Sequence, residues 1–212
     1  MSRGRSSRVI TAVERETELA LVARLRQGDA DAFDDVYAAF NTRLFTFLVR
    51  LSRRRDVAED LLEETWLRLV KHARRLRPDT RLGPWLFTVA RHLHVSFNRS
   101  RVLEDSAAAS LIAVWPFSFE QASPFEAAAA SELERRIERA LAALPSTSRE
   151  VLLLVGVAGL THSDAADVCG ITPEALRQRL HRAREALATA LERDAATEPP
   201  PALGGIASCP SR

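Results

Sequence analysis

Apolar residues recur every three or four positions along almost the whole chain, and this is the period of one face of an α-helix. The two-residue alternation that is typical of β-strands does not appear in any run of β-branched residues. We therefore expect an all-α protein. In the first half of the chain the periodicity predicts helices at residues 14–27, about 31–51, 56–73 and about 85–101.

An acidic stretch divides the chain into two parts. Residues 102–134 contain six acidic residues, two prolines and no Lys or Arg, which is typical of a connection between domains. The total of 212 residues is enough for two small domains. We expect two small helical domains joined by a flexible linker: a basic N-terminal extension at 1–13, a first domain at 14–101, the linker at 102–130, a second domain at 131–193 and a disordered tail at 194–212.

The composition argues against several classes of protein. No segment approaches the roughly 18 consecutive apolar residues of a membrane span, and no secretory signal is recognisable. Cys169 and Cys209 have neither a metal-ligand nor a disulfide spacing, so we expect a location in the reducing cytoplasm. His92 and His94 point to different faces of a helix and make a poor metal pair. We expect no metal, no cofactor and no catalytic residue.

The net charge of +2 hides a sharp segregation of charge along the chain. Residues 56–67 contain five acidic residues and no basic one, whereas residues 68–101 contain nine basic residues and one acidic residue. On the helix at 56–73, one side turned away from the expected core forms an acidic face of Asp60, Glu63 and Glu64. This face is either a docking surface for a basic partner or a solvated surface that suits a helix N-terminus.

A basic and polar face is expected on the helix at 85–101. Its members follow each other at three- and four-residue spacing, begin after the aromatic Phe87 and are Arg91, His94, Asn98 and Arg101. Such a face suits phosphate contact and base stacking, although a simple solvated face is the alternative. Leu86, Val89, Leu93 and Phe97 make the expected buried stripe, and Trp85 is expected to anchor the core.

The most specific pattern lies in residues 160–184. Thr161 can cap a short helix that ends at Gly170, and Thr172 with Pro173 can start a second helix. This arrangement predicts a helix-turn-helix whose second helix is placed to enter the major groove of DNA. That helix would bury Leu176 and Leu180.

The second helix of this motif exposes side chains that favour contacts with base edges. They are Arg177, Gln178, His181, Arg182 and Arg184, with no acidic residue among positions 177–184. Arginine pairs with guanine and glutamine pairs with adenine in the major groove. The alternative is a helical hairpin that carries these arginines by chance.

Four segments carry a resemblance to a known family: LRQGDADAF at 25–33, VAEDLLEETW at 57–66, PWLFTVAR at 84–91 and LRQRLHRAREAL at 176–187. In this order and spacing they resemble a small two-domain bacterial sigma factor of the extracytoplasmic-function type. The resemblance covers about residues 15–101 and 131–193. It implies a sigma region 2 helical bundle in the first domain and a sigma region 4 helix-turn-helix in the second.

The resemblance also implies partners for each surface. The acidic face would dock on the coiled coil of the RNA polymerase clamp. The basic face of the helix at 85–101 would read and help open the minus-ten promoter element. The helix-turn-helix would bind the minus-thirty-five element. Core RNA polymerase and promoter DNA are thus the expected partners, and an anti-sigma factor is the usual regulator of such proteins.

Two other functions remain to be distinguished from promoter recognition with polymerase. A stand-alone helix-turn-helix regulator would bind a palindromic site without polymerase, and it would leave the charge pattern of the first domain unexplained. A helical enzyme or adaptor would need convergent polar side chains in an apolar pocket, which the sequence does not offer at a recognisable spacing.

Overall fold

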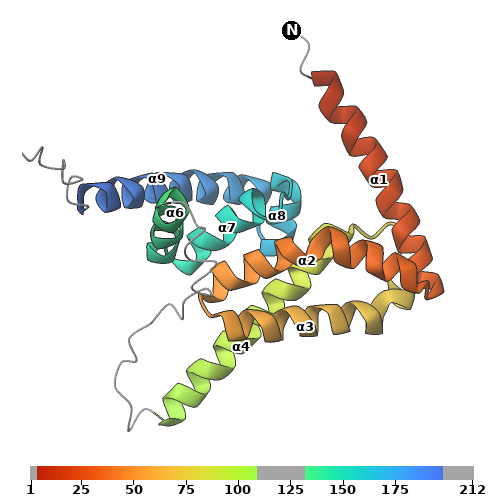
Figure 1. Cartoon of the computed structure of the whole chain (residues 1–212), viewed down its shortest axis with the longest axis horizontal. Helices are drawn as coiled ribbons and strands as arrows, with labels where there is room; N and C mark the ends of the chain where they lie inside the picture. Colours follow the sequence, from red (N-terminus) through yellow and green to blue (C-terminus); the bar gives the residue numbers. More distant parts are fainter. Residues whose placement is uncertain (1–3, 109–131, 198–212) are drawn as a thin grey trace, which may run out of the picture.

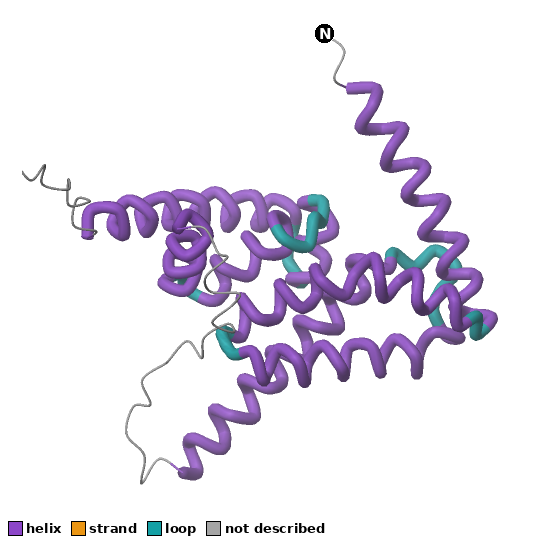
Figure 2. The backbone as a smooth tube through the Cα atoms, viewed as in Figure 1, coloured by secondary structure: helices purple, strands orange, loops and turns teal. Residues whose placement is uncertain are grey.

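The structure, a computed structural model, describes the backbone of residues 4–108 and 132–197 and the side chains of residues 15–100 and 134–194. Within these residues every regular element is helical and no strand occurs, which confirms the all-α prediction (Figure 2). The first group of helices is α1 (Gly4–Gln27), α2 (Ala30–Ser52), α3 (Arg55–His72), the 3-10 helix η1 (Ala73–Arg75) and α4 (Leu82–Ala108). The second group is α6 (Glu132–Ala143), α7 (Ser146–Gly156), α8 (His162–Cys169) and α9 (Pro173–Thr197).

Local interactions define where α2 begins. The Asp29 side chain accepts hydrogen bonds from the backbone N–H groups of Asp31 at 3.0 Å and Ala32 at 3.4 Å. A hydrogen bond from Arg24 lowers the pKa of the Asp29 carboxyl. Gly28 precedes this cap with a φ of 83°, a conformation that glycine adopts without strain. The turn directs α2 away from the end of α1 and alongside α3 (Figure 1).

The beginning of α4 differs from the sequence prediction. The helix starts at Leu82 instead of about residue 85, and Gly83 and Pro84 lie inside its first turn. Proline is tolerated there because the first N–H groups of a helix have no partner within the helix. Glu18 of α1 supplies one instead, since its Oε1 accepts hydrogen bonds from the N–H of Leu82 at 2.6 Å and of Gly83 at 3.5 Å.

Other element boundaries also differ. The first helix starts at Gly4, inside the predicted extension at 1–13, and α4 runs to Ala108, inside the predicted linker. The apolar segment at 114–119 and the tail from 198 onwards lie outside the described residues. Val70 of α3 follows the three- and four-residue spacing of the apolar residues that this helix buries, but its side chain is 59% exposed.

The helix-turn-helix in the second domain is confirmed. Thr161 Oγ1 accepts a hydrogen bond from the N–H of Asp164 at 3.2 Å, and Gly170 ends α8 with a φ of 66°. Thr172 Oγ1 then accepts a hydrogen bond from the N–H of Ala175 at 3.2 Å and starts α9. The side chains that α9 buries include Leu176, Leu180 and Ala183.

The two domains pack against each other (Figure 1). The contacts join α8 to α4 and α7 to α2, and one hydrophobic cluster runs through both domains. Gly83 lies at this junction, where a Cβ atom would stand 3.4 Å from the Phe40 ring and 3.6 Å from Leu160. A Cβ atom at position 83 would therefore make ordinary van der Waals contact with both domains.

Candidate functional site

An open apolar groove of about 360 Å³ lies between α2 and α3. Several of its lining side chains are unusually exposed for their size, namely Tyr37 at 42%, Leu67 at 43% and Val70 at 59%. Glu59 and Glu63 stand at its edge. An exposed apolar strip bordered by carboxylates is suited to an amphipathic helix with basic flanks.

The predicted acidic face lies on the same helix as this groove. Asp60 and Glu63 are exposed, and Glu64 is half-buried. Arg68 donates a hydrogen bond to Glu64 at 2.9 Å, which lowers the pKa of the Glu64 carboxyl. Asp60 and Glu63 are therefore the freer carboxylates for a partner, and Glu64 is already paired within α3.

A second groove, of about 400 Å³, opens where α3 and η1 meet the start of α4. Its walls include Arg68, Arg75 and Arg77, of which Arg68 pairs with Glu64 and Arg77 with Asp79, and also His72 and Thr80. Its apolar lining consists of Leu76, Trp85 and Val89. Positive charge around an aromatic ring is the combination that binds single-stranded nucleic acid through phosphate contact and base stacking.

The lining of this basic groove continues along α4. Trp85 and Val89 are followed at the same helical spacing by His92, Ser96 and Arg99, all three of which are exposed. This stripe is nearly opposite the basic face predicted from the sequence. Trp85 packs against the core, as predicted, and it also lines the basic groove.

The second domain meets the predicted basic face of α4 at Arg91, and His94 of the same face is buried. Arg91 donates a hydrogen bond from Nε to Glu150 of α7 at 2.9 Å, and His94 is only 6% exposed. Burial lowers the pKa of His94 to about 4, and the charges of Arg149 and Arg91 act in the same direction. His94 is therefore neutral near pH 7.

The remaining members of that face have different surroundings. Asn98 is exposed and lies with Nδ2 3.1 Å from His94 Nε2, whereas the side chain of Arg101 is outside the described residues. Phe87, expected at the head of the face, is fully buried and packs edge-on against Phe47 at 5.3 Å. DNA contact by Arg91 or His94 would thus require the domains to separate.

All five predicted contact residues of α9 are exposed: Arg177, Gln178, His181, Arg182 and Arg184. Glu174 pairs with Arg177, and the pKa of the Glu174 carboxyl is lowered by that hydrogen bond. His181 lies 3.4 Å from Glu185. The exposed surface of α9 is therefore polar. Within the part of the chain that the structure describes, Arg182 and Arg184 form no ion pair.

Sequence reasoning missed the basic groove as a unit. The excess of basic residues at 68–101 was the available signal, but it did not show that α3, η1 and α4 bring Arg75, Arg77 and Trp85 together.

The part of the chain that the structure describes holds no cluster of His, Cys, Asp and Glu suited to a metal ion. None of its helices is both long and apolar enough to span a bilayer.

Comparison with known proteins identifies both domains. The sigma-70 region 2 family model matches residues 36–102, and the sigma-70 region 4 model matches residues 134–187. The ECF RNA polymerase sigma factor EcfG of Rhodopseudomonas palustris is 34% identical over 166 residues, which is 78% of this chain and 87% of that protein. The sigma factor CarQ of Myxococcus xanthus is 34% identical over 164 residues, which is 77% of this chain and 91% of that protein.

Solved structures show the same fold. CnrH in complex with the cytosolic domain of CnrY aligns with a TM-score of 0.63 at 20% identity, over 84% of this chain and 98% of that chain. The sigma factor RpoE of Bartonella quintana, solved with the anti-sigma factor NepR, aligns with a TM-score of 0.61 at 26% identity, over 76% of this chain and 98% of that chain.

A region 2 bundle followed by a region 4 helix-turn-helix is the architecture of a small sigma factor. The chain belongs to the extracytoplasmic-function family of RNA polymerase sigma factors.

Proposed function

We propose that the chain binds core RNA polymerase through the acidic, apolar groove of α2 and α3 and directs the enzyme to promoters through two separate DNA-binding surfaces. This proposal rests mainly on the arrangement of three surfaces in the structure. A single bundle places an acidic docking surface and a basic groove on adjacent parts of α3, while α9 exposes a third surface suited to duplex DNA. A self-contained regulator needs only the third surface.

The docking partner is a basic amphipathic helix of the polymerase clamp. Its apolar side would lie on Leu67 and Val70, which are exposed beside the groove, and its basic residues would meet Asp60 and Glu63. Burial of apolar area supplies affinity, and the carboxylates orient the helix and speed its association.

The minus-ten element binds in the basic groove as a partly unpaired strand. Arg75 and Arg77 contact its phosphates, and an unstacked base lies against Trp85. The exposed stripe of His92, Ser96 and Arg99 extends this contact along α4. Arg91, His94, Asn98 and Arg101, the residues expected from the sequence, contribute to DNA binding after the second domain has moved away.

The minus-thirty-five element is duplex DNA, and α9 reads it from the major groove. Gln178 and Arg182 lie one helical turn apart and contact base edges, while Arg177, His181 and Arg184 contribute base or phosphate contacts beside them. The cap of α8 at Thr161 and the cap of α9 at Thr172 hold the two helices of the motif in place.

The chain performs no chemistry in this proposal. Sigma factors are transcription initiation factors and not enzymes by themselves, so the catalytic site is that of the polymerase. We place the protein in the cytoplasm because its partners, core polymerase and promoter DNA, are there. An anti-sigma factor is the proposed regulator, since the Bartonella quintana sigma factor was solved with one.

Reconstitution with core RNA polymerase tests the proposal. The chain should confer run-off transcription on a subset of a promoter library and should give no specific footprint without polymerase. Specific binding to a palindromic site by the chain alone would favour the stand-alone regulator instead.

A further inference from the structure

A short loop forms one wall of the basic groove, and none of its own side chains is buried. Leu76 and Leu82, which flank the loop, are buried, but the side chains between them are exposed or half-buried. Within the loop, the N–H of Thr80 donates to the carbonyl of Arg77 at 3.0 Å, which closes a single turn. The place of this turn beside the groove therefore depends on contacts from outside the loop.

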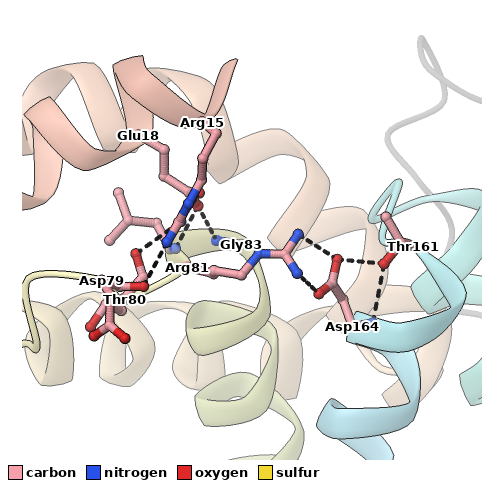
Figure 3. Close-up of polar contacts among 9 residues, drawn as sticks. Arg15, Glu18, Asp79, Thr80, Arg81, Gly83, Thr161 and Asp164 are labelled. Carbon is pink, nitrogen blue, oxygen red and sulfur yellow. Dashed lines mark hydrogen bonds and ion pairs between the residues drawn. The ribbon is translucent and has the colours of Figure 1, made fainter. Parts of the chain in front are cut away.

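Two side chains of α1, one helical turn apart, bind this loop and the helix that follows it (Figure 3). Arg15 donates from Nη2 to the carbonyl of Asp79 at 2.7 Å and from Nη1 to that of Thr80 at 3.4 Å. Oε1 of Glu18 accepts from the first N–H groups of α4. Its other oxygen, Oε2, accepts from Arg15 Nη1 at 2.6 Å, so the two side chains form one connected unit.

Each end of this unit matches the backbone groups that it meets. Residues 79 and 80 present carbonyl oxygens, which need donors, whereas the first turn of α4 presents N–H groups, which need acceptors. The carboxylate of Glu18 also has the sign of charge that the N-terminal end of a helix favours. An arginine at 15 and a glutamate at 18 can therefore hold the loop and the helix at the same time. The same two side chains in exchanged positions could hold neither.

The segment that α1 holds lies between two residues of the basic groove. Thr80, whose carbonyl Arg15 binds, lines the groove, and so does Trp85 from the first turn of α4. The N–H of Trp85 donates to the carbonyl of Arg81 at 3.0 Å, so the indole follows the start of this helix directly. A shift at the start of α4 would move Trp85 relative to Thr80 and would change the width of the groove.

We propose that Arg15 and Glu18 are positioning residues for minus-ten recognition: from α1 they keep Thr80 and Trp85 at the separation that accepts an unpaired strand. Neither α1 side chain lines the groove, so both act through the backbone of the loop and the helix. The role in recognition rests on the proposed function of the basic groove, but the hold of α1 on residues 79–83 does not.

Hydrogen–deuterium exchange of the full chain tests this hold without DNA or polymerase. The key variant combines Arg15→Glu with Glu18→Arg, which keeps the net charge and lets the two side chains still pair along α1. It also turns a carboxylate towards the carbonyl groups of the loop and a guanidinium towards the N–H groups of α4. We expect the amides of Leu82 and Gly83 to exchange several-fold faster in this variant.

The matched control combines Glu16→Arg with Arg26→Glu, two exposed residues of the same helix, and should exchange as the wild type does. Arg81 keeps its partner Asp164 in all these chains, so faster exchange reports the loss of the contacts from α1. Circular dichroism checks that the helical content is retained. Wild-type exchange rates in the key variant would overturn the proposal.

Promoter opening by the holoenzyme tests the consequence for recognition. The probe is a promoter that the wild-type holoenzyme selects from a library, and permanganate reactivity of its minus-ten thymines reports the open fraction. We expect Glu18→Ala to reduce this fraction roughly threefold or more, the scale of a lost helix cap. Glu18→Gln keeps an acceptor oxygen and should retain most of the opening. Affinity for core polymerase should not change, because the docking groove lies between α2 and α3.

A double-mutant cycle with Trp85 separates positioning from a general loss of stability. Because Glu18 acts by placing the indole, Glu18→Ala should have a much smaller effect in a Trp85→Leu chain than in the wild type. Equal effects in the two chains, or faster exchange with unchanged opening, would overturn the role in recognition. A wild-type holoenzyme that opens no promoter would count against the proposed function alone, since the exchange measurement uses no DNA.

Discussion

The indole Nε1 of Trp66 donates a hydrogen bond to Oδ1 of Asn41 at 3.1 Å, and this bond ties α3 to α2 beneath the apolar groove. The rings of Phe33 and Tyr37 pack on the same indole, with ring centroids 5.8 and 4.9 Å away. The groove wall is therefore formed before any partner arrives. A preformed surface loses less conformational entropy on binding than one that must be ordered.

Reversing charge beside this groove should weaken polymerase binding. We expect Asp60→Arg combined with Glu63→Arg to reduce affinity for core polymerase at least tenfold, because two carboxylates that attract a basic helix become two repulsive charges. Fluorescence anisotropy of the labelled chain with core polymerase measures this. Glu185→Arg combined with Glu192→Arg on α9 is the matched control with the same change in net charge, and an equal loss in that variant would point to net charge as the cause.

Truncating Arg182 should weaken minus-thirty-five recognition. We expect Arg182→Ala to cost about 1–3 kcal/mol at the cognate sequence and to relax discrimination at one base position. Competition of holoenzyme with a set of minus-thirty-five variants measures both effects. The exposed Arg26 of α1 offers the control Arg26→Ala. A uniform loss over all sequences would make Arg182 a phosphate contact.

Removing the aromatic ring from the basic groove should impair promoter opening. Base stacking on an aromatic side chain contributes about 1–3 kcal/mol, so Trp85→Leu should reduce the open fraction roughly fivefold or more. Trp85→Phe retains a ring and should keep most of the activity. Permanganate reactivity of unpaired thymines in the minus-ten region reports the open fraction. Equal opening by the leucine and phenylalanine variants would exclude stacking on Trp85.

Acid should loosen the contact between the domains through His94. Its pKa is about 4 in the folded chain, against an ordinary value of 6.5, so the folded chain keeps this histidine neutral while an exposed one takes up a proton. Stability from His94 is therefore complete above about pH 6.5 and is lost as the pH falls towards 4. The shift corresponds to about 3 kcal/mol at most.

The measurement is chemical denaturation between pH 7 and pH 5, compared with His94→Gln. The charges of Arg91 of α4 and Arg149 of α7 act on this histidine, and Glu150 of α7 binds Arg91; the variant leaves all three in place. The wild type should lose more stability than the variant over this range. Parallel losses would show that the carboxylates of the protein, and not His94, dominate its acid response.

The sequence predicted the elements whose signals are local. The caps at Thr161 and Thr172 and the turn at Gly170 act within a few residues, and all three occur where the sequence placed them. The exposed face of α9 was also predicted, because only one side of that helix packs in the second domain.

The covered face of α4 could not be predicted in the same way. Periodicity identifies one buried stripe, but α4 packs against two partners, the core of the first domain and the second domain. Arg91 and His94 have the composition of an exposed face, and their partner Glu150 lies 59 residues away from Arg91 in the chain. The start of α4 was missed for a related reason, since its capping carboxylate comes from a different helix.

The capping carboxylate of Glu18 limits where the chain can be cut into fragments, because it holds the start of α4 from a different helix. The region 2 family model begins at residue 36, after the whole of α1. A fragment cut at that boundary would leave the first N–H groups of α4 without their acceptor and the loop at Asp79 and Thr80 without Arg15. The smallest fragment of the first domain that keeps these contacts therefore includes the first helix, although the family model does not match it.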